Sequence, residues 1–126
     1  MDADRQKLLD DLKVAIQEVE GAFRTLVPGI SGHVPFDESN PDGPRLGFQK
    51  HGSHWQTYWQ VVYTDGHDPE PLLNKSLKVR LEAVPRLPDL YTRLCLNEEA
   101  QTEQVEQAVK DLRSFTAGLL KEDKTP

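Results

Sequence analysis

The strongest constraint on the fold is a run of β-forming residues near the middle of the chain, at positions 54–64. Its alternate positions hold aromatic and β-branched side chains: Trp55, Thr57, Trp59, Val61 and Tyr63. A period of two is typical of a β-strand. Residues 45–49 alternate in the same way, and His51-Gly52-Ser53 offers a turn between the two runs. The pattern predicts an antiparallel β-hairpin over 45–64, which needs further strands or packed helices to be stable.

Two long segments with helical periodicity can supply that support. Over 3–26, apolar residues recur at three- and four-residue steps until Pro28-Gly29 ends the pattern. A second long helix is predicted over 98–120, with Asn97 as its N-cap. Its apolar stripe consists of Val105, Ala108, Val109, Leu112, Phe115, Thr116 and Leu119.

The remaining segments are shorter or irregular. Residues 28–44 are rich in proline and glycine and predict a long loop, and the polar segment 121–126 predicts a frayed tail. Ser76 is expected to cap a short helix over 77–84. Pro85 and Pro88 are expected to separate that helix from a second short one over 88–96. The whole chain, 1–126, is therefore expected to form a single α+β domain: a long helix, a hairpin or small sheet, two short helices and a long helix.

Composition excludes several classes of protein. The formal net charge of −6 argues against general nucleic-acid binding, which needs an excess of basic residues. Cys95 is the single cysteine, so a disulfide scaffold and a cysteine zinc site are excluded. No apolar run could span a membrane and no signal-peptide pattern is present, so a cytoplasmic protein is expected. Since phosphate loops, nucleophile elbows and metal-binding motifs are absent, no cofactor is expected.

The hairpin is the first candidate binding surface, because residues 44–64 contain no Asp or Glu. Aromatic and basic residues are mixed along it: Arg45, Lys50, His51, His54, Trp55, Tyr58 and Trp59. Such a mixture can bind a partner protein or, less readily, stack the bases of single-stranded nucleic acid. The other interpretation is that Trp55 and Trp59 belong to the core. Tyr58, between two glutamines, is then the aromatic residue expected to be exposed.

The histidines are a second candidate. His51 and His54 flank the hairpin turn, whereas His67 lies in the next loop beside Asp65 and Asp68. The two groups would be about 30 Å apart along the strand, so they cannot form one metal site unless another element joins them. Exposed turn residues are the simpler interpretation.

Two further features have ordinary structural explanations. A mildly basic stretch could hold an anion near Ser76 and Lys78 or could be a solvated face that pairs with acidic residues: Lys75, Lys78, Arg80, Arg86 and Arg93. Cys95 lies between Leu94 and Leu96, as is typical of a small buried residue rather than a reactive thiol.

Two functions remain open. The first is a non-enzymatic binding or assembly module, which would form a homodimer through the amphipathic helices or bind a partner protein at the hairpin. The second is a small enzyme or ligand-binding domain. Its site would lie between the 28–44 loop and the hairpin and would use His33, His51 or His54.

Overall fold

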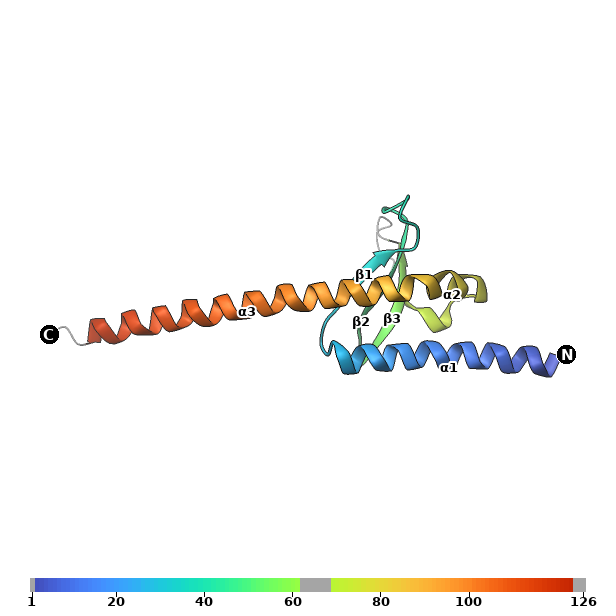
Figure 1. Ribbon diagram of the computed structural model, residues 1–126, viewed down its shortest axis with the longest axis horizontal. Coiled ribbons are helices and arrows are strands. Elements are labelled where there is room, and N and C mark those ends of the chain that lie inside the picture. The colour runs from blue at the N-terminus through green and yellow to red at the C-terminus, as the bar shows by residue number, and fades with distance from the viewer. Residues whose placement is uncertain (1, 62–68, 124–126) are drawn as a thin grey trace.

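The computed structural model describes residues 2–61 and 69–123 and has an α+β fold, as the sequence predicts. Two long helices lie on one side of a four-stranded antiparallel sheet whose strand order is β1-β2-β3-β4 (Figure 1). The long helices are α1 (Asp2–Leu26) and α3 (Leu87–Asp123), and the short helix α2 (Leu77–Ala83) precedes α3. The strands are β1 (Gly32–Pro35), β2 (Pro44–His51), β3 (His54–Val61) and β4 (Glu70–Pro71).

The hydrophobic core lies between the two long helices and the sheet. Both helices and the first two strands contribute to it: Ile16, Phe23, Val34, Leu46, Phe48, Leu87, Leu90 and Leu94. Phe23 links the sheet to α3, because its ring makes a T-shaped contact with Phe48 at 5.5 Å and stacks on Tyr91 at 5.8 Å between centroids. The middle of the periodic apolar face that predicts the first helix, at Ile16 and Phe23, therefore packs into the core, whereas Leu8 and Leu26 near its ends are exposed.

The predicted hairpin is confirmed, and the sheet is larger than the sequence alone indicates. β2 and β3 pair from Pro44↔Val61 to His51↔His54, and Gly52 has a φ of 60°, as the first position of a type II′ turn requires. The prediction that 28–44 is only a loop is wrong, since β1 lies within it and pairs with β2. Of the expected strand 54–64, residues 62–64 lie outside the described residues.

The division of the second half of the chain into three helices is also wrong. After α2, a 3-10 turn covers Val84–Arg86, and α3 then runs without a break for 37 residues. Pro88 falls in the first turn of α3, where its missing N–H costs nothing. Asn97 is not a cap, because its side-chain amide donates to the Ser31 carbonyl at 2.9 Å. The helix also continues through 121–123, where the sequence predicts a frayed tail, and the rest of that tail lies outside the described residues.

Ser76 caps α2 as predicted, because its hydroxyl accepts a hydrogen bond from the Val79 amide. Replacing Ser76 by alanine is expected to lower the free energy of unfolding by about 1 kcal/mol, since the amide loses its acceptor. Urea denaturation followed by tryptophan fluorescence measures this change. Ser76→Asp, which keeps an acceptor, is the control and should recover most of the loss, whereas equal losses in both variants would contradict the capping role.

Candidate interaction surface

The most unusual feature of the structure is the C-terminal part of α3, which extends far beyond the rest of the molecule (Figure 1). We call residues 99–122 the α3 tail, and every side chain in it is exposed. At 1.5 Å per residue, the tail is about 36 Å long. An isolated helix of this kind gains nothing from tertiary packing, which normally supplies most of a helix's stability.

The α3 tail nevertheless carries the apolar stripe that the sequence predicts for a packed helix. Several of its large side chains are at least half exposed, among them Leu112 at 65% and Phe115 at 64%. Val105, Leu112 and Leu119 follow one another at seven-residue intervals, and Ala108 and Phe115 interleave with them. Steps of three and four residues are the pattern by which one helix packs against another.

This stripe continues the helix face that is already buried in the body of the protein. Leu87 and Leu94 in the core belong to the same seven-residue series as Ala108 and Phe115. The face is therefore covered by α1 and the sheet at the start of α3 and uncovered in the tail. The stripe on the tail is therefore apolar like the core, but no element of the described structure covers it.

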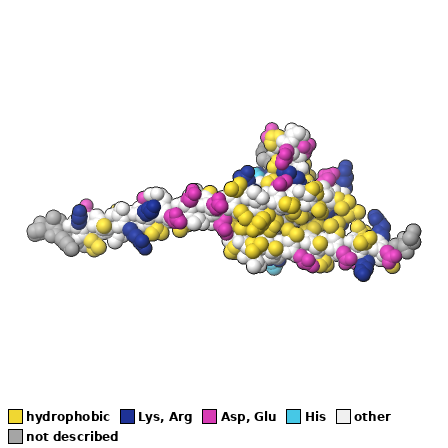
Figure 2. Space-filling model, viewed as in Figure 1, with side chains coloured by type: hydrophobic (Ala, Val, Ile, Leu, Met, Phe, Trp, Pro, Cys, Tyr) yellow, Lys and Arg dark blue, Asp and Glu magenta, His cyan; other side chains and the backbone are white. Residues whose placement is uncertain are grey.

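Charge is unevenly distributed along this part of α3. Residues 98–106 include four glutamates and no basic residue, whereas 107–122 include Lys110, Arg113 and Lys121 with two acids, Asp111 and Glu122. Figure 2 shows the acidic side chains gathered where α3 leaves the body and the basic ones nearer its C-terminal end. The first half of the tail is thus strongly acidic, and the second half has a small excess of positive charge.

The structure distributes the hairpin residues over two faces of the sheet. On the face toward the helices, the Trp55 ring lies 5.8 Å from Phe48, and Lys75 Nζ lies 4.1 Å above the Trp59 ring. Lys50 lies opposite Trp55 on the neighbouring strand, and its side chain is exposed. The aromatic rings of this face are therefore engaged in packing, in line with a core role for the tryptophans.

The opposite face carries the other candidate residues of the hairpin. His54 is exposed, and Arg45 donates to Gln60 Oε1 through Nε at 3.2 Å and Nη2 at 2.8 Å. The expectation that Tyr58 is exposed is wrong, because only 3% of it is accessible. The ring lies against Gly47, whose missing side chain leaves room for it, and the edge of the His51 ring lies beside it. Burial raises the pKa of the Tyr58 hydroxyl.

The histidines do not converge on one site. His51 and His54 face each other across the turn, whereas His33 pairs with Gly47, about 13 Å further along β2. His67 and its neighbours Asp65 and Asp68 lie outside the described residues. Within 2–61 and 69–123, no group of three or more His, Cys, Asp or Glu side chains could hold a metal ion. Cys95 is half-buried and packs against the core.

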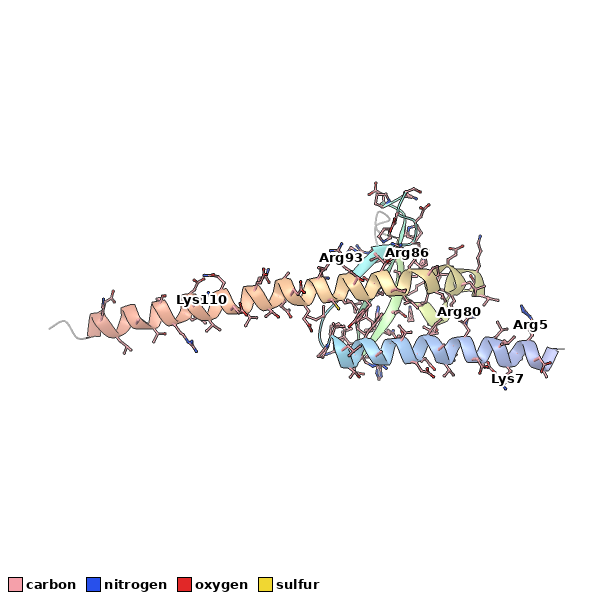
Figure 3. All side chains as sticks on the ribbon, in the orientation of Figure 1. Arg5, Lys7, Arg80, Arg86, Arg93 and Lys110 are labelled. Carbon is pink, nitrogen blue, oxygen red and sulfur yellow. The ribbon has the colours of Figure 1, made fainter. Side chains whose placement is uncertain are left out.

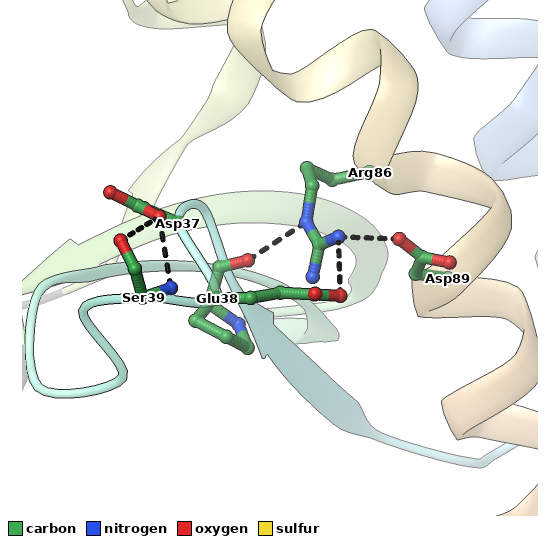
Figure 4. Close-up of polar contacts among 6 residues, drawn as sticks. Asp37, Glu38, Ser39, Arg86 and Asp89 are labelled. Carbon is green, nitrogen blue, oxygen red and sulfur yellow. Dashed lines mark hydrogen bonds and ion pairs between the residues drawn. The ribbon is translucent and has the colours of Figure 1, made fainter.

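Two of the five residues of the basic stretch, Lys75 and Arg86, form ion pairs in the described part of the chain. Arg86 joins the loop after β1 to α3, because it donates to the Pro35 carbonyl at 2.9 Å and pairs with Glu38 and Asp89 (Figure 4). Lys75 pairs with Glu70 at 3.1 Å. In the same loop as Glu38, hydrogen bonds from Ser39 lower the pKa of the Asp37 carboxyl.

Comparisons with known proteins give no relative. No family model, curated protein or solved structure matches this chain. In the described part of the chain, no helix has an apolar stretch long enough to cross a membrane. The interpretation of the α3 tail therefore depends on its own chemistry. The sequence predicts the apolar stripe of the α3 tail but not that the stripe is exposed. Periodicity does not show whether another element of the fold covers an apolar face.

Proposed function

We propose that this protein is a non-enzymatic assembly module that forms a homodimer through its α3 tail. The observation that carries the proposal is the uncovered apolar stripe, which continues the core-facing side of α3. A large apolar side chain contributes about 1.5–3 kcal/mol when it is fully buried. In a symmetric dimer, both copies contribute each side chain of the stripe to the interface. Pairing two tails covers the stripe without any change in the body of the protein.

A second copy of the chain fits the tail because two tails that run antiparallel bring matching apolar side chains together. The stripe from Val105 to Leu119 is centred on Leu112, so antiparallel tails related by a two-fold axis at Leu112 place Val105 opposite Leu119 of the second copy. This orientation brings the acidic half of each tail beside the basic half of the other. Parallel pairing would align the four glutamates of one copy with the same four of the other, which is unfavourable.

The first test is the mass of the full chain in solution. Native mass spectrometry and light scattering are expected to give twice the chain mass of 14.3 kDa. Leu112→Glu places two charges at the centre of the interface and is expected to give a monomer with an unchanged melting profile of the body. Ala117→Glu adds the same charge to the same helix about 140° away from Leu112, so this variant should remain dimeric.

Two outcomes would overturn the proposal. One is a wild-type protein that stays monomeric at high micromolar concentration. The other is a dimer that Leu112→Glu and Ala117→Glu affect equally, which would place the interface elsewhere.

Orientation is tested by disulfide trapping in a Cys95→Ala background. Antiparallel tails predict that a mixture of Val105→Cys and Leu119→Cys chains gives the mixed disulfide in preference to either symmetric one. Parallel tails predict the reverse. Symmetric disulfides alone would therefore contradict the antiparallel arrangement while leaving assembly through the tail intact.

A further inference from the structure

A hollow between the edge strand β1 and α3 contains an unusual concentration of positive charge for an acidic protein. Its volume is about 520 Å³, and its polar lining includes His33, Arg45, Arg93 and Asn97. None of its lining residues is Asp or Glu. Three separate elements, β1, β2 and α3, thus bring two guanidinium groups and an imidazole to one cavity.

Two of these side chains are held in place by other contacts. The Arg45 guanidinium is fixed by Gln60, which occupies Nε and Nη2 and leaves Nη1 without a hydrogen bond among the described residues. The Asn97 amide is held by the Ser31 carbonyl at 2.9 Å. Fixed donors reduce the entropy lost on binding a ligand.

Arg93 differs from Arg86 beside it on the same side of β1, because it has no counter-ion among the residues that the structure describes. Arg86 pairs with Glu38 and Asp89, whereas Arg93 makes no ion pair or hydrogen bond with any described residue. It projects from α3 on the side where β1 lies (Figure 3). The charge of Arg93 is therefore available to a ligand.

We propose that this hollow binds a small phosphate-bearing anion. Arginine forks and an imidazole N–H match the oxygen atoms of a phosphate group, and charge-assisted hydrogen bonds are the strongest that such donors make. The cavity has room for more than a phosphate ion, so a phosphate monoester is the ligand class that fits it best. This site is separate from the α3 tail and does not depend on the proposed dimer.

The state of His33 gives a direct readout. Burial, together with the charges of Arg45 and Arg93, lowers the pKa of the His33 imidazole. A bound anion offsets the two arginine charges and favours the imidazolium form, so it is expected to raise that pKa. By linkage, sulfate, which keeps its charge throughout this range, should bind more tightly as the pH falls through the pKa of His33.

The experiment is an NMR titration of the His33 ring in the full-length protein. Inorganic phosphate at millimolar concentration is expected to raise its pKa, whereas chloride at matched ionic strength is not. Glycerol phosphate should bind more tightly than inorganic phosphate if the natural ligand is a monoester. Arg93→Gln is expected to weaken phosphate binding by about tenfold or more, as the loss of a charge-assisted contact implies.

Arg113→Gln is the matched control, because it removes the same charge from the α3 tail, far from the hollow. Its affinity for phosphate should equal that of the wild type. Arg45→Lys keeps the charge but not the fork, so it should also weaken binding. The proposal is wrong if phosphate and chloride shift His33 alike, or if the Arg93 and Arg113 variants lose affinity equally.

Discussion

Replacing Gly47 by alanine is expected to lower the free energy of unfolding by about 3 kcal/mol, at the upper end of the range for overpacked cores. A Cβ at this position would lie 2.1 Å from Cζ of the buried Tyr58 ring. The ring cannot yield easily, because it is confined between the backbone of β2 and its neighbours on the sheet. The midpoint of thermal unfolding should fall by roughly 10 °C for a chain of this size.

Two controls separate this steric effect from the general effect of replacing glycine. Gly118 lies on the α3 tail, and an added Cβ there would meet no atom within 4 Å, so Gly118→Ala should leave stability unchanged or slightly higher. In a Tyr58→Ala background, Gly47→Ala should cost less than about 1 kcal/mol, because the clashing ring is gone. A similar cost with and without the Tyr58 ring would contradict the packing of Tyr58 on Gly47.

Replacing Glu20 by alanine is expected to cost about 3 kcal/mol, because it leaves two buried donors without an acceptor. Glu20 is only 5% exposed, and its Oε2 accepts hydrogen bonds at 2.6 Å from both the amide and the hydroxyl of Thr57. Among the described residues, β4 pairs with Tyr58 and Trp59 and does not reach Thr57. Glu20 therefore supplies the acceptor for the Thr57 amide. The contact also fixes α1 on the sheet.

Chemical denaturation of three variants measures this contribution. Glu20→Gln keeps an acceptor oxygen but not the charge, and should lose less than Glu20→Ala. Glu18→Ala removes an exposed carboxylate from the same helix and should change stability by no more than about 0.5 kcal/mol. If the Glu18 and Glu20 alanine variants were equally stable, the buried hydrogen bonds would have no net value.

The sequence is a reliable guide to local structure but a poor guide to long-range partners. It predicts α1, the hairpin and the Ser76 cap, because each follows from periodicity or from a side chain acting on its own backbone. It misses β1, since four residues among prolines and glycines have little intrinsic preference and become a strand only beside β2. It also breaks α3 at Asn97, where the amide is instead bound by the distant Ser31 carbonyl.

The candidate sites show the same difference. The sequence places an apolar stripe on the last helix and basic residues near the loop, and both are present. It assigns the aromatic side chains of the hairpin to a possible surface, whereas Tyr58 is buried on Gly47 and Trp55 packs on Phe48. The hollow at His33 was not predictable as a whole, because Arg45 and Arg93 come from segments far apart in the chain.

Local patterns in the chain thus specify most of the helical and extended segments and the apolar faces that they carry, since both depend on neighbours a few residues apart. Which of these apolar faces are covered, and which charges meet, follows only from the packed arrangement of the elements. The reason is that burial depends on the position of every other element. The same stripe on α3 is core at Leu94 and solvent-exposed at Leu112 because α1 and the sheet extend only as far as the first turns of the helix.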